Sequence, residues 1–339
     1  MKVLVTGCAG FVGFHVAHKL MERGDAVVGL DSVNDYYEPE LKEARLAELQ
    51  KCASRCGAQY AFVRADLADR DTVESLFKSD AFDRVIHLAA QPGVRYSLSH
   101  PHAYIANNVD GFMNILEGCR HAKVAHLTFA SSSSVYGANR RMPFSEHDGV
   151  DHPLSLYAAT KRANELMAHA YSHLYGLPMT GLRFFTVYGP WGRPDMAPMI
   201  FTRKLLAGEP IEMFNDGNHS RDFTYIDDIV EGVVRVSDKI ATPAAGWDAS
   251  SPDPATSNAP FRLFNIGCSS PVALAEFVEA LESTTGKKAV RVPRPLQPGD
   301  VVDTHADMAE LHRYVGYSPV TSVSDGVRKF VKWYRAYYG

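Results

Sequence analysis

The first thirteen residues of the chain constrain its fold more than any other part. Residues 2–6 have the apolar character of a short buried strand, and residues 11–22 carry apolar side chains at helical spacing. Gly7, Gly10 and Gly13 lie at and just after the turn between them. A strand, a glycine-rich turn and a helix in this order predict the first unit of a parallel β-sheet covered by helices.

The glycine spacing also indicates what this turn can bind. Gly7 permits the tight turn, Gly10 lets the backbone approach a ligand, and Gly13 lets the helix pack close to the strand. Phe11 and Val12 begin the helix, so their N–H groups lack helical partners and favour a phosphate. These five residues predict a site for the pyrophosphate of a dinucleotide. The G-x-x-G-x-x-G spacing is one residue wider than the fingerprint of other dehydrogenases.

An acidic residue narrows the choice of dinucleotide. The second predicted strand, 26–31, ends at Asp31, which is 18 residues after Gly13. A carboxylate at this place hydrogen-bonds the ribose hydroxyls and repels a 2′-phosphate. We therefore expect the cofactor to be NAD rather than NADP.

Predicted strands and helices alternate along the first half of the chain. The strands are 2–6, 26–31, 60–65, 83–89, 124–131 and 179–184, and the helices are 11–22, 39–51, 71–78, 102–121 and 157–175. This alternation predicts an α/β fold with a doubly wound parallel sheet, that is, a Rossmann fold. Ligands bind such sheets at the carboxyl ends of the strands.

Beyond the sixth predicted strand, prolines interrupt the pattern and shorter, mixed elements follow. We expect residues 1–187 to form the NAD-binding domain and residues 188–339 to form mostly a smaller, mixed α/β lobe that binds the substrate. Segments near 220–236 and 261–267 are expected to return to the first domain. Residues 239–260 are rich in Ala, Pro, Ser, Asp and Thr, which predicts an exposed loop.

Composition and charge exclude several classes of protein. A formal net charge of −4 gives no basic surface for nucleic acid, and no run of 18 apolar residues is present to span a membrane. Lys2 leads directly into the first strand, which leaves no room for a signal peptide.

The chain has five cysteines. Two of them, Cys52 and Cys56, have no His or Cys cluster nearby to complete a metal site. We expect a cytoplasmic protein with no metal, nucleic acid or membrane partner.

A tyrosine and a lysine form the second informative motif. Tyr157 and Lys161 are four residues apart on a predicted helix and share one face, and the serines 131–134 precede them. A free phenol, with a pKa near ~10, is a poor base at neutral pH, but a nearby cation favours the phenolate. Tyr157 can then take a proton from a sugar or alcohol hydroxyl as hydride leaves the same carbon, while Lys161 holds the nicotinamide ribose.

Together these motifs resemble the extended short-chain dehydrogenase/reductase superfamily, the nucleotide-sugar epimerases and dehydratases. The resemblance runs nearly end to end and includes residues 7–13, Asp31, 66–67, 87–90, 107–108, 131–137, 157–161 and 221–228. It implies that Ser132 assists catalysis and that Asp66 and Leu67 bracket the adenine. The further residues that it places near the cofactor are Asn34, Leu88, Ala89, Ala90 and Asn108.

Longer strings resemble one branch of this superfamily, the UDP-glucuronate 4-epimerases. The strings are residues 31–37, 92–97, 183–197 and 264–267, together with the loop through 252–254. This resemblance implies an NAD-dependent enzyme that interconverts UDP-glucuronate and UDP-galacturonate. It also implies a homodimer, packed through helices near 102–121 and 157–175.

A uronate substrate has a particular chemical need. Oxidation at C4 gives a 4-keto sugar with a carboxylate on C5, and this β-keto acid loses CO₂ when the bond to the carboxylate aligns with the carbonyl π system. An epimerase must hold the carboxylate out of that alignment, for which hydroxyls and a cation are suited because charge-assisted hydrogen bonds are strong. The candidates are Ser132, Ser133, Ser134, Thr186 and Arg193, with Met196 as a further substrate contact.

The UDP half of the substrate needs its own partners. By resemblance, Arg221 is a candidate for the diphosphate, and Gln297 and Asp300 belong to a late substrate loop in which many relatives carry Arg at position 297. Phe214 could pack on the uracil or belong to the core. Arg95 could serve the diphosphate or the carboxylate, or simply order its own loop.

Other functions remain open at this point. UDP-glucuronate decarboxylases share the fold and cofactor, but by resemblance that branch carries Glu where this chain has Ser134. Another UDP-sugar 4-epimerase is the second enzyme alternative. An NAD-binding scaffold protein is the alternative that is not an enzyme, and it would have no need of Tyr157, Lys161 and Ser132.

Overall fold

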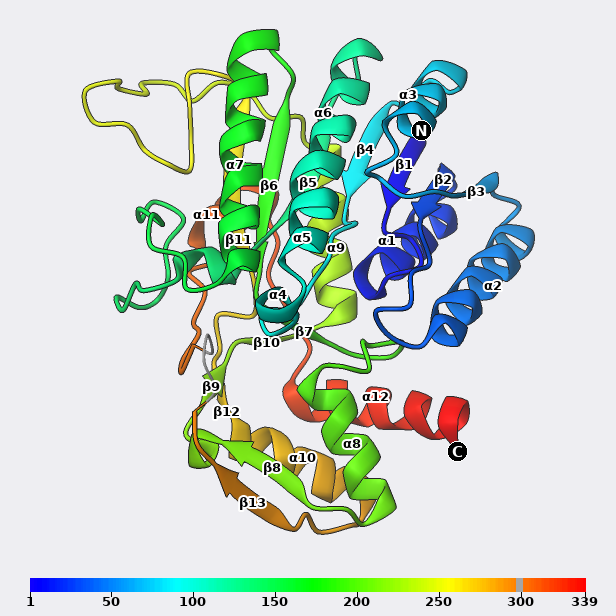
Figure 1. The fold of residues 1–339 in the computed structure, drawn as a ribbon, viewed down its shortest axis with the longest axis vertical. Helices are drawn as coiled ribbons and strands as arrows, with labels where there is room; N and C mark the ends of the chain where they lie inside the picture. Colours follow the sequence, from blue (N-terminus) through cyan, green and yellow to red (C-terminus); the bar gives the residue numbers. More distant parts are fainter. Residues whose placement is uncertain (297–300) are drawn as a thin grey trace.

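A seven-stranded sheet forms the centre of the computed structural model, which describes residues 1–296 and 301–339. Its strands, in spatial order, are β11 (Phe261–Ile266), β6 (Met179–Phe184), β5 (Leu127–Ser132), β4 (Arg84–His87), β1 (Lys2–Thr6), β2 (Ala26–Asp31) and β3 (Tyr60–Arg64). Every neighbouring pair is parallel. The sheet confirms the doubly wound α/β fold expected from the sequence (Figure 1).

Strand β1 shows why helices cover both faces of this sheet. Because side chains alternate along a strand, Val3 and Val5 join one hydrophobic core and Leu4 joins the other. The helices on the first face are α1 (Phe11–Glu22), α2 (Pro39–Cys56) and α9 (Ile226–Asp238), and those on the second are α3 (Arg70–Ser79), α6 (Gly111–His121) and α7 (Leu156–Tyr175). None of the helices described in the structure is long and apolar enough to cross a membrane.

Two helices differ from the sequence prediction. Helix α2 continues to Cys56, where Gly57 adopts a left-handed conformation with φ +66° and ends it. The helix predicted over 102–121 is divided into α5 (Pro101–Tyr104), a π-helical turn η1 (Ile105–Asp110) and α6, after a short helix α4 (Tyr96–Ser99). Since a π turn adds a residue to each turn, it changes which side chains face the sheet edge.

Most of the remaining elements gather beyond one end of the sheet (Figure 1). They are β7 (Thr186–Tyr188), β8 (Ile211–Phe214), β9 (Ser220–Arg221), β10 (Phe223–Tyr225), β12 (Val272–Ala273), β13 (Arg291–Arg294), α8 (Ala197–Ala207), α10 (Leu274–Thr285), α12 (Val323–Tyr338) and two 3₁₀ turns, η2 (Ser133–Tyr136) and η3 (Asn215–Gly217). Helix α11 (Ala309–Val315) instead lies beside β11 and α9. Strand β11 pairs with β6, so the segment near 261–267 lies in the central sheet. The exact domain boundaries stay a prediction.

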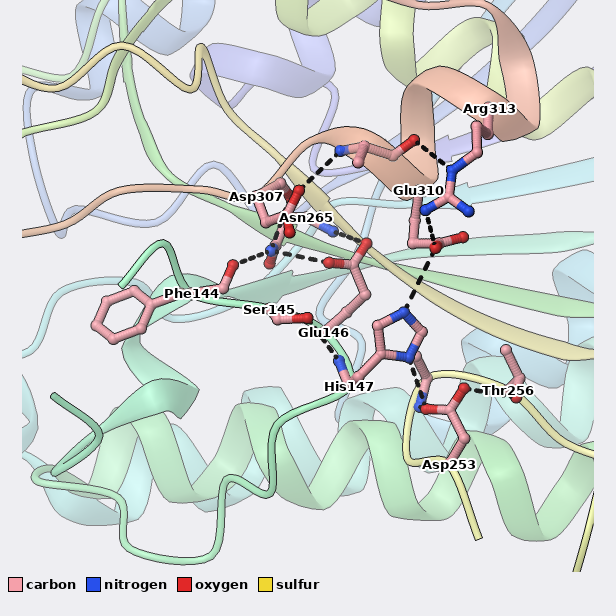
Figure 2. A network of polar contacts seen from close by, with 12 residues as sticks. Phe144, Ser145, Glu146, His147, Asp253, Thr256, Asn265, Asp307, Glu310 and Arg313 are labelled. Carbon is pink, nitrogen blue, oxygen red and sulfur yellow. Dashed lines mark hydrogen bonds and ion pairs between the residues drawn. The ribbon is translucent and has the colours of Figure 1, made fainter. Parts of the chain in front are cut away.

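A polar network, buried at Asn265 and partly exposed at His147, connects distant segments near the sheet edge, as Figure 2 shows. The side-chain nitrogen of Asn265, in β11, donates to the carbonyl oxygens of Phe144 (2.8 Å) and Asp307 (3.1 Å). His147 contacts Asp253 at 2.9 Å, which anchors the 239–260 segment. This segment is therefore not exposed throughout, because Ala255, Ser257 and Ala259 are buried.

Candidate active site

A cavity of about 390 Å³ lies at the carboxyl ends of the central strands. Residues at or just after the ends of β1, β2, β4, β5 and β6 line it, as a doubly wound sheet requires. The predicted residues on its wall are Gly7, Gly10, Phe11, Val12, Gly13, Asp31, Asn34, Leu67, Leu88, Ala89, Ala90, Ser132, Ser133, Ser134, Tyr157, Lys161, Thr186, Arg193 and Met196. Most of the residues proposed for cofactor, chemistry and sugar thus meet in one place.

The glycine turn is packed so closely that it has no room for a side chain at Gly7 or Gly13. Gly7 has φ +75°, and a Cβ there would lie 2.7 Å from the backbone nitrogen of Ala89. A Cβ on Gly13 would lie 2.1 Å from the carbonyl oxygen of Gly7. Helix α1 therefore begins directly against the turn, and its first N–H groups lie beside the cavity without a side-chain cap. This arrangement fits the diphosphate of a dinucleotide.

Replacing Gly13 by alanine should weaken dinucleotide binding. The new Cβ must push α1 away from the turn, because the atom it meets is backbone and cannot rotate aside. Overpacking of this kind costs ~1–3 kcal/mol, so we expect a loss of affinity of roughly fivefold to 150-fold. Calorimetric titration of nucleotide-free protein with NAD measures the loss. Gly149→Ala is the control, because a Cβ there would meet only the Asp151 side chain, at 3.6 Å.

The Asp31 carboxylate is held by the backbone around it. Its Oδ2 accepts from the N–H of Ala9 (3.0 Å), in the glycine turn, and its Oδ1 accepts from the N–H of Val33 (2.8 Å). Burial raises the pKa of Asp31, while these hydrogen bonds and the charge of Lys42 oppose that rise. An acceptor fixed at the end of β2, beside the diphosphate turn, fits a ribose with free hydroxyls.

Tyr157 and Lys161 lie at the start of α7. Ser155 caps this helix, its hydroxyl accepting from the N–H of Ala158 (3.1 Å), and so fixes Tyr157 in the first turn. Ser132, at the end of β5, lies near Tyr157, and its hydroxyl acts to lower the Tyr157 pKa. Lys161 donates to the carbonyl oxygen of Ala130 (2.9 Å), also in β5. The predicted catalytic residues therefore form one group built from a helix and the adjacent strand.

The electrostatics of this group differ in one respect from the sequence-based expectation. Burial raises the pKa of Tyr157, while the polar Ser132 side chain and the charge of Arg193 oppose that rise. Arg193, rather than Lys161, is thus the cation that favours the phenolate here. Burial also lowers the pKa of Lys161 to about 8.

A buried ion pair supports the serine strand from behind. Glu165, one turn after Lys161, accepts from the Arg183 guanidinium through both oxygens (2.9 and 3.0 Å). It also accepts from the hydroxyl of Ser131 (2.6 Å), next to Ser132. The side chains of Glu165 and Arg183 are 1% and 0% exposed, so this pair fixes α7, β5 and β6 relative to one another.

Arg193 reaches the cavity from the segment after β7. Its guanidinium makes a two-pronged ion pair with Asp195, from Nε to Oδ1 (3.1 Å) and from Nη2 to Oδ2 (2.6 Å). The hydroxyl of Tyr36 donates to Oδ2 of Asp195 (3.1 Å). The two charged side chains are 20% and 30% exposed, so the ion pair is mostly buried, with Arg193 on the cavity wall.

Sequence reasoning missed several residues of the wall. Tyr36, Tyr37, Lys42 and Asn107 line the cavity. Both tyrosines belong to residues 31–37, the string that resembles the epimerases, and this was the available signal for them. Asn107 depends on the π turn η1, which no spacing in the sequence indicates.

Comparison with known proteins assigns a family to this arrangement. Residues 3–247 match the NAD dependent epimerase/dehydratase family. The chain belongs to this family. It is 52% identical over 338 residues to Protein CapI of Staphylococcus aureus, spanning 100% of this chain and 99% of that protein. It is 48% identical over 346 residues to UDP-glucuronate 4-epimerase 4 of Arabidopsis thaliana, spanning 100% and 76% respectively. The crystal structure of Bacillus cereus UDP-glucuronic acid 4-epimerase, in complex with UDP-glucuronic acid and NAD, matches with a TM-score of 0.87 and 33% identity, covering 99% of each chain.

In this member of the epimerase/dehydratase family, two residues predicted to bind the cofactor do not line the cavity. Asn108 is buried, and its side chain brackets Gln91, accepting from the Gln91 N–H (2.7 Å) and donating to the Gln91 carbonyl (3.1 Å). Asp66 is exposed and accepts from the N–H of Ala68 (2.9 Å), which forms the turn before α3. The geometry gives both residues a structural task, while the adjacent Asn107 and Leu67 line the cavity.

The described residues predicted for the UDP half, Arg95, Phe214 and Arg221, also lie outside the cavity wall. The Arg95 guanidinium stacks over the ring of Phe214, 5.1 Å from its centroid, so these two are brought together. Arg221 donates to the carbonyl oxygen of Val302 (2.6 Å). Gln297 and Asp300 lie outside the described residues.

His87 behaves as a packed strand-end residue rather than a catalytic base. Its Nδ1 lies 2.8 Å from the hydroxyl oxygen of Thr6, in the neighbouring strand, and its ring packs on Phe112. Burial lowers its pKa to about 3, so it stays neutral at physiological pH.

Proposed function

We propose that this chain interconverts UDP-glucuronate and UDP-galacturonate through transient oxidation at C4 with bound NAD. The observation that carries the proposal is the joint placement of Tyr157, Thr186 and Arg193 on one cavity wall. A proton acceptor, a hydroxyl and a cation are what a uronate needs at C4 and at its carboxylate. The names of the Arabidopsis relative and the Bacillus cereus structure support the same substrate.

The residues of this chain divide the chemistry in a simple way. When bound, NAD supplies a hydride acceptor at C4 and later a hydride donor to the opposite face. Tyr157 takes the proton of the 4-hydroxyl and returns it at the end of the cycle. Ser132 hydrogen-bonds the reacting oxygen, and Lys161 orients the ribose beside it. Ser132 and Tyr157 both line the cavity, so both can reach the same substrate oxygen.

The rest of the sugar site must keep the carboxylate out of line with the C4 carbonyl. Arg193, Thr186, Ser133 and Ser134 offer one cation and three hydroxyls for this purpose. A decarboxylase is the less favoured alternative because Ser134 stands where that branch carries Glu. A neutral UDP-sugar 4-epimerase is less favoured because it has no use for Arg193, and a scaffold protein because it has no use for Tyr157.

The product spectrum of the purified protein tests the proposal. We expect UDP-glucuronate to be converted to UDP-galacturonate with no added reductant or oxidant, since the cycle is redox-neutral. We also expect denaturation to release NAD, because a cofactor that is not consumed need not leave. NMR of the sugar nucleotides and enzymatic assay of the released nucleotide measure both. A strict need for a stoichiometric reductant, or release of NADP, would contradict the proposal.

Arg193→His should change the product rather than only slow the reaction. A histidine retains hydrogen bonding but loses the fixed charge and reach of guanidinium, so the 4-keto sugar can rotate into alignment and lose CO₂. We expect the ratio of UDP-4-keto-pentose to UDP-galacturonate to rise, measured by NMR. Arg235→His is the control, because Arg235 pairs with Glu231 on the surface. If Arg193→His epimerises normally, or loses activity with no decarboxylated product, Arg193 does not hold the carboxylate.

We assign the UDP half to Arg95, Phe214, Arg221, Gln297 and Asp300, and the substrate-binding lobe to residues within 188–339. The support for the lobe is that Phe214 and Arg221 lie on β8 and β9, beyond the end of the central sheet. These assignments rest on the resemblance and on the stacking of Arg95 on Phe214.

We further propose a homodimer formed through α6 and α7. Leu166 and Leu174 of α7 are 55% and 65% exposed, and Met113 of α6 is 36% exposed, so the pair of helices presents apolar side chains to solvent. Burying such a face in a second copy removes these apolar side chains from water.

The free state of all five cysteines supports a reducing, cytoplasmic location.

A further inference from the structure

Asp195 uses only part of the hydrogen-bonding capacity of Arg193. A guanidinium has five N–H donors arranged in a plane. Asp195 takes the Nε–H and one Nη2–H, which form the side of the guanidinium. The other three N–H donors, two on Nη1 and one on Nη2, lie at the end of the guanidinium and are not bound by Asp195. A second carboxylate can therefore bind the end of the guanidinium while Asp195 keeps its side.

The ion pair is itself held from the cofactor side of the cavity. Tyr36 follows the ribose-binding end of β2, and its hydroxyl donates to Asp195 (3.1 Å). The Tyr36 ring packs edge-on against Tyr96, with ring centroids 4.9 Å apart. Burial raises the pKa of Tyr36 to about 12, so its hydroxyl stays protonated and remains a donor.

The backbone that carries Arg193 is fixed as well. The fully buried Arg45, on α2, donates to the carbonyl oxygens of Trp191 (2.6 Å) and Gly192 (3.3 Å). The same guanidinium donates to the carbonyl oxygen of Ala9 (2.8 Å), in the glycine turn. Both ends of the Arg193 side chain are thus restrained, its backbone by Arg45 and its guanidinium by Asp195.

We propose that Asp195 is a positioning residue that fixes the plane of the Arg193 guanidinium and so determines how the sugar carboxylate is held. This inference rests on the proposed function, because the carboxylate is that of the uronate. Asp195 acts through Arg193 and has no need to touch the substrate. Its consequence is control over the product, epimer or decarboxylated sugar.

The same residue has an electrostatic cost for substrate binding. The negative charge of Asp195 offsets that of Arg193 and repels the incoming carboxylate. Removing it should therefore strengthen binding of a uronate while freeing the guanidinium to turn. Loss of a residue needed only for folding would not tighten substrate binding and change the product at the same time. Measuring both the affinity and the product ratio therefore identifies the positioning role.

Asp195→Asn tests this inference. The amide keeps one acceptor but turns an NH₂ group toward the guanidinium, so the two-pronged contact is lost. We expect the KM for UDP-glucuronate to fall roughly fivefold, the effect of one unit charge at about 4 Å in water. With NAD⁺ supplied in excess, we expect the fraction of 4-keto-pentose to rise roughly tenfold, because a charge-assisted contact has been lost. In this side reaction the bond from C5 to the carboxylate breaks and C5 takes a proton, and each ketone released would consume one NAD⁺. Tyr36→Phe should shift the product in the same direction, by less.

The control and the contrary outcomes are well defined. Asp151→Asn removes a surface carboxylate that pairs with Arg162 at 3.5 Å, and it should change neither quantity. A lower KM with no decarboxylated product would mean that Asp195 only competes with the substrate, and would overturn the positioning role. An unchanged KM and product ratio, or loss of both activities with a lowered Tm, would also overturn it.

Calorimetry separates this inference from the proposed function. UDP-glucose lacks the carboxylate, so Asp195→Asn should tighten binding of UDP-glucuronate and leave UDP-glucose unchanged. This selectivity is measured without turnover. If the wild-type protein makes no UDP-galacturonate, the epimerase proposal fails while the binding data still test the Asp195–Arg193 pair. Equal changes for both nucleotide sugars would contradict the inference even in an active epimerase.

Discussion

Tyr157→Phe is expected to lower kcat by ~10²–10⁴-fold while leaving the affinity for UDP-glucuronate largely intact. The phenolic oxygen is the proton acceptor in the proposed mechanism, and the phenylalanine ring fills the same space against Tyr104, whose ring lies 6.0 Å away. Steady-state kinetics give kcat, and calorimetry gives the affinity. Retention of more than about a tenth of wild-type turnover would contradict the proton-acceptor role.

The pH profile adds a second measurement to this prediction. Burial raises the pKa of the Tyr157 hydroxyl, so in the wild type the deprotonated form becomes more abundant as pH increases. The wild-type rate should therefore rise with pH, and the residual rate of Tyr157→Phe should not follow this slope. Tyr171→Phe is a matched control, since that hydroxyl contacts Glu117 on α6, away from the cavity.

Glu165→Ala is expected to lower the free energy of unfolding by about 3–5 kcal/mol. It removes one partner of a fully buried ion pair and leaves the Arg183 guanidinium without a counter-charge. Ser131 also loses its acceptor, so the end of β5 that carries Ser132 should loosen and kcat should fall as well. Urea unfolding at neutral pH measures the stability. Glu48→Ala, which removes an exposed partner of Lys51, should cost less than ~1 kcal/mol.

The stability difference should depend on pH. Burial tends to raise the pKa of Glu165, but Arg183 and its other partners outweigh burial and hold the pKa below its ordinary value. A carboxyl with a depressed pKa stabilises the folded state above its unfolded pKa, near ~4.3, and this contribution is lost as pH falls through the folded value. The gap between wild type and Glu165→Ala should therefore narrow below about pH 4. A gap of the same size at all pH values would contradict the ion-pair explanation.

The local motifs could be predicted from the sequence because short spacings fix their geometry. Gly7, Gly10 and Gly13 must meet at one turn, since strand and helix follow each other within a few residues. Tyr157 and Lys161 share a helix face at any i, i+4 spacing. The alternation of strands and helices then places such motifs at one sheet edge, which is why the cavity contains most of the predicted residues.

Contacts between distant segments were decided only by the tertiary structure. Tyr36 and Asp195 are 159 residues apart, and Arg45 and Trp191 are 146 apart, so no local pattern relates them. Their meeting depends on how α2 and the segment after β7 pack against the sheet edge. The π turn likewise places Asn107 rather than Asn108 on the cavity wall.

The sequence by itself thus determined the sheet, the dinucleotide turn and the tyrosine–lysine pair, because local spacing sets their geometry. The tertiary structure alone decided how Arg193 is oriented, because that orientation depends on Asp195, Tyr36 and Arg45, which come together only when the core has packed.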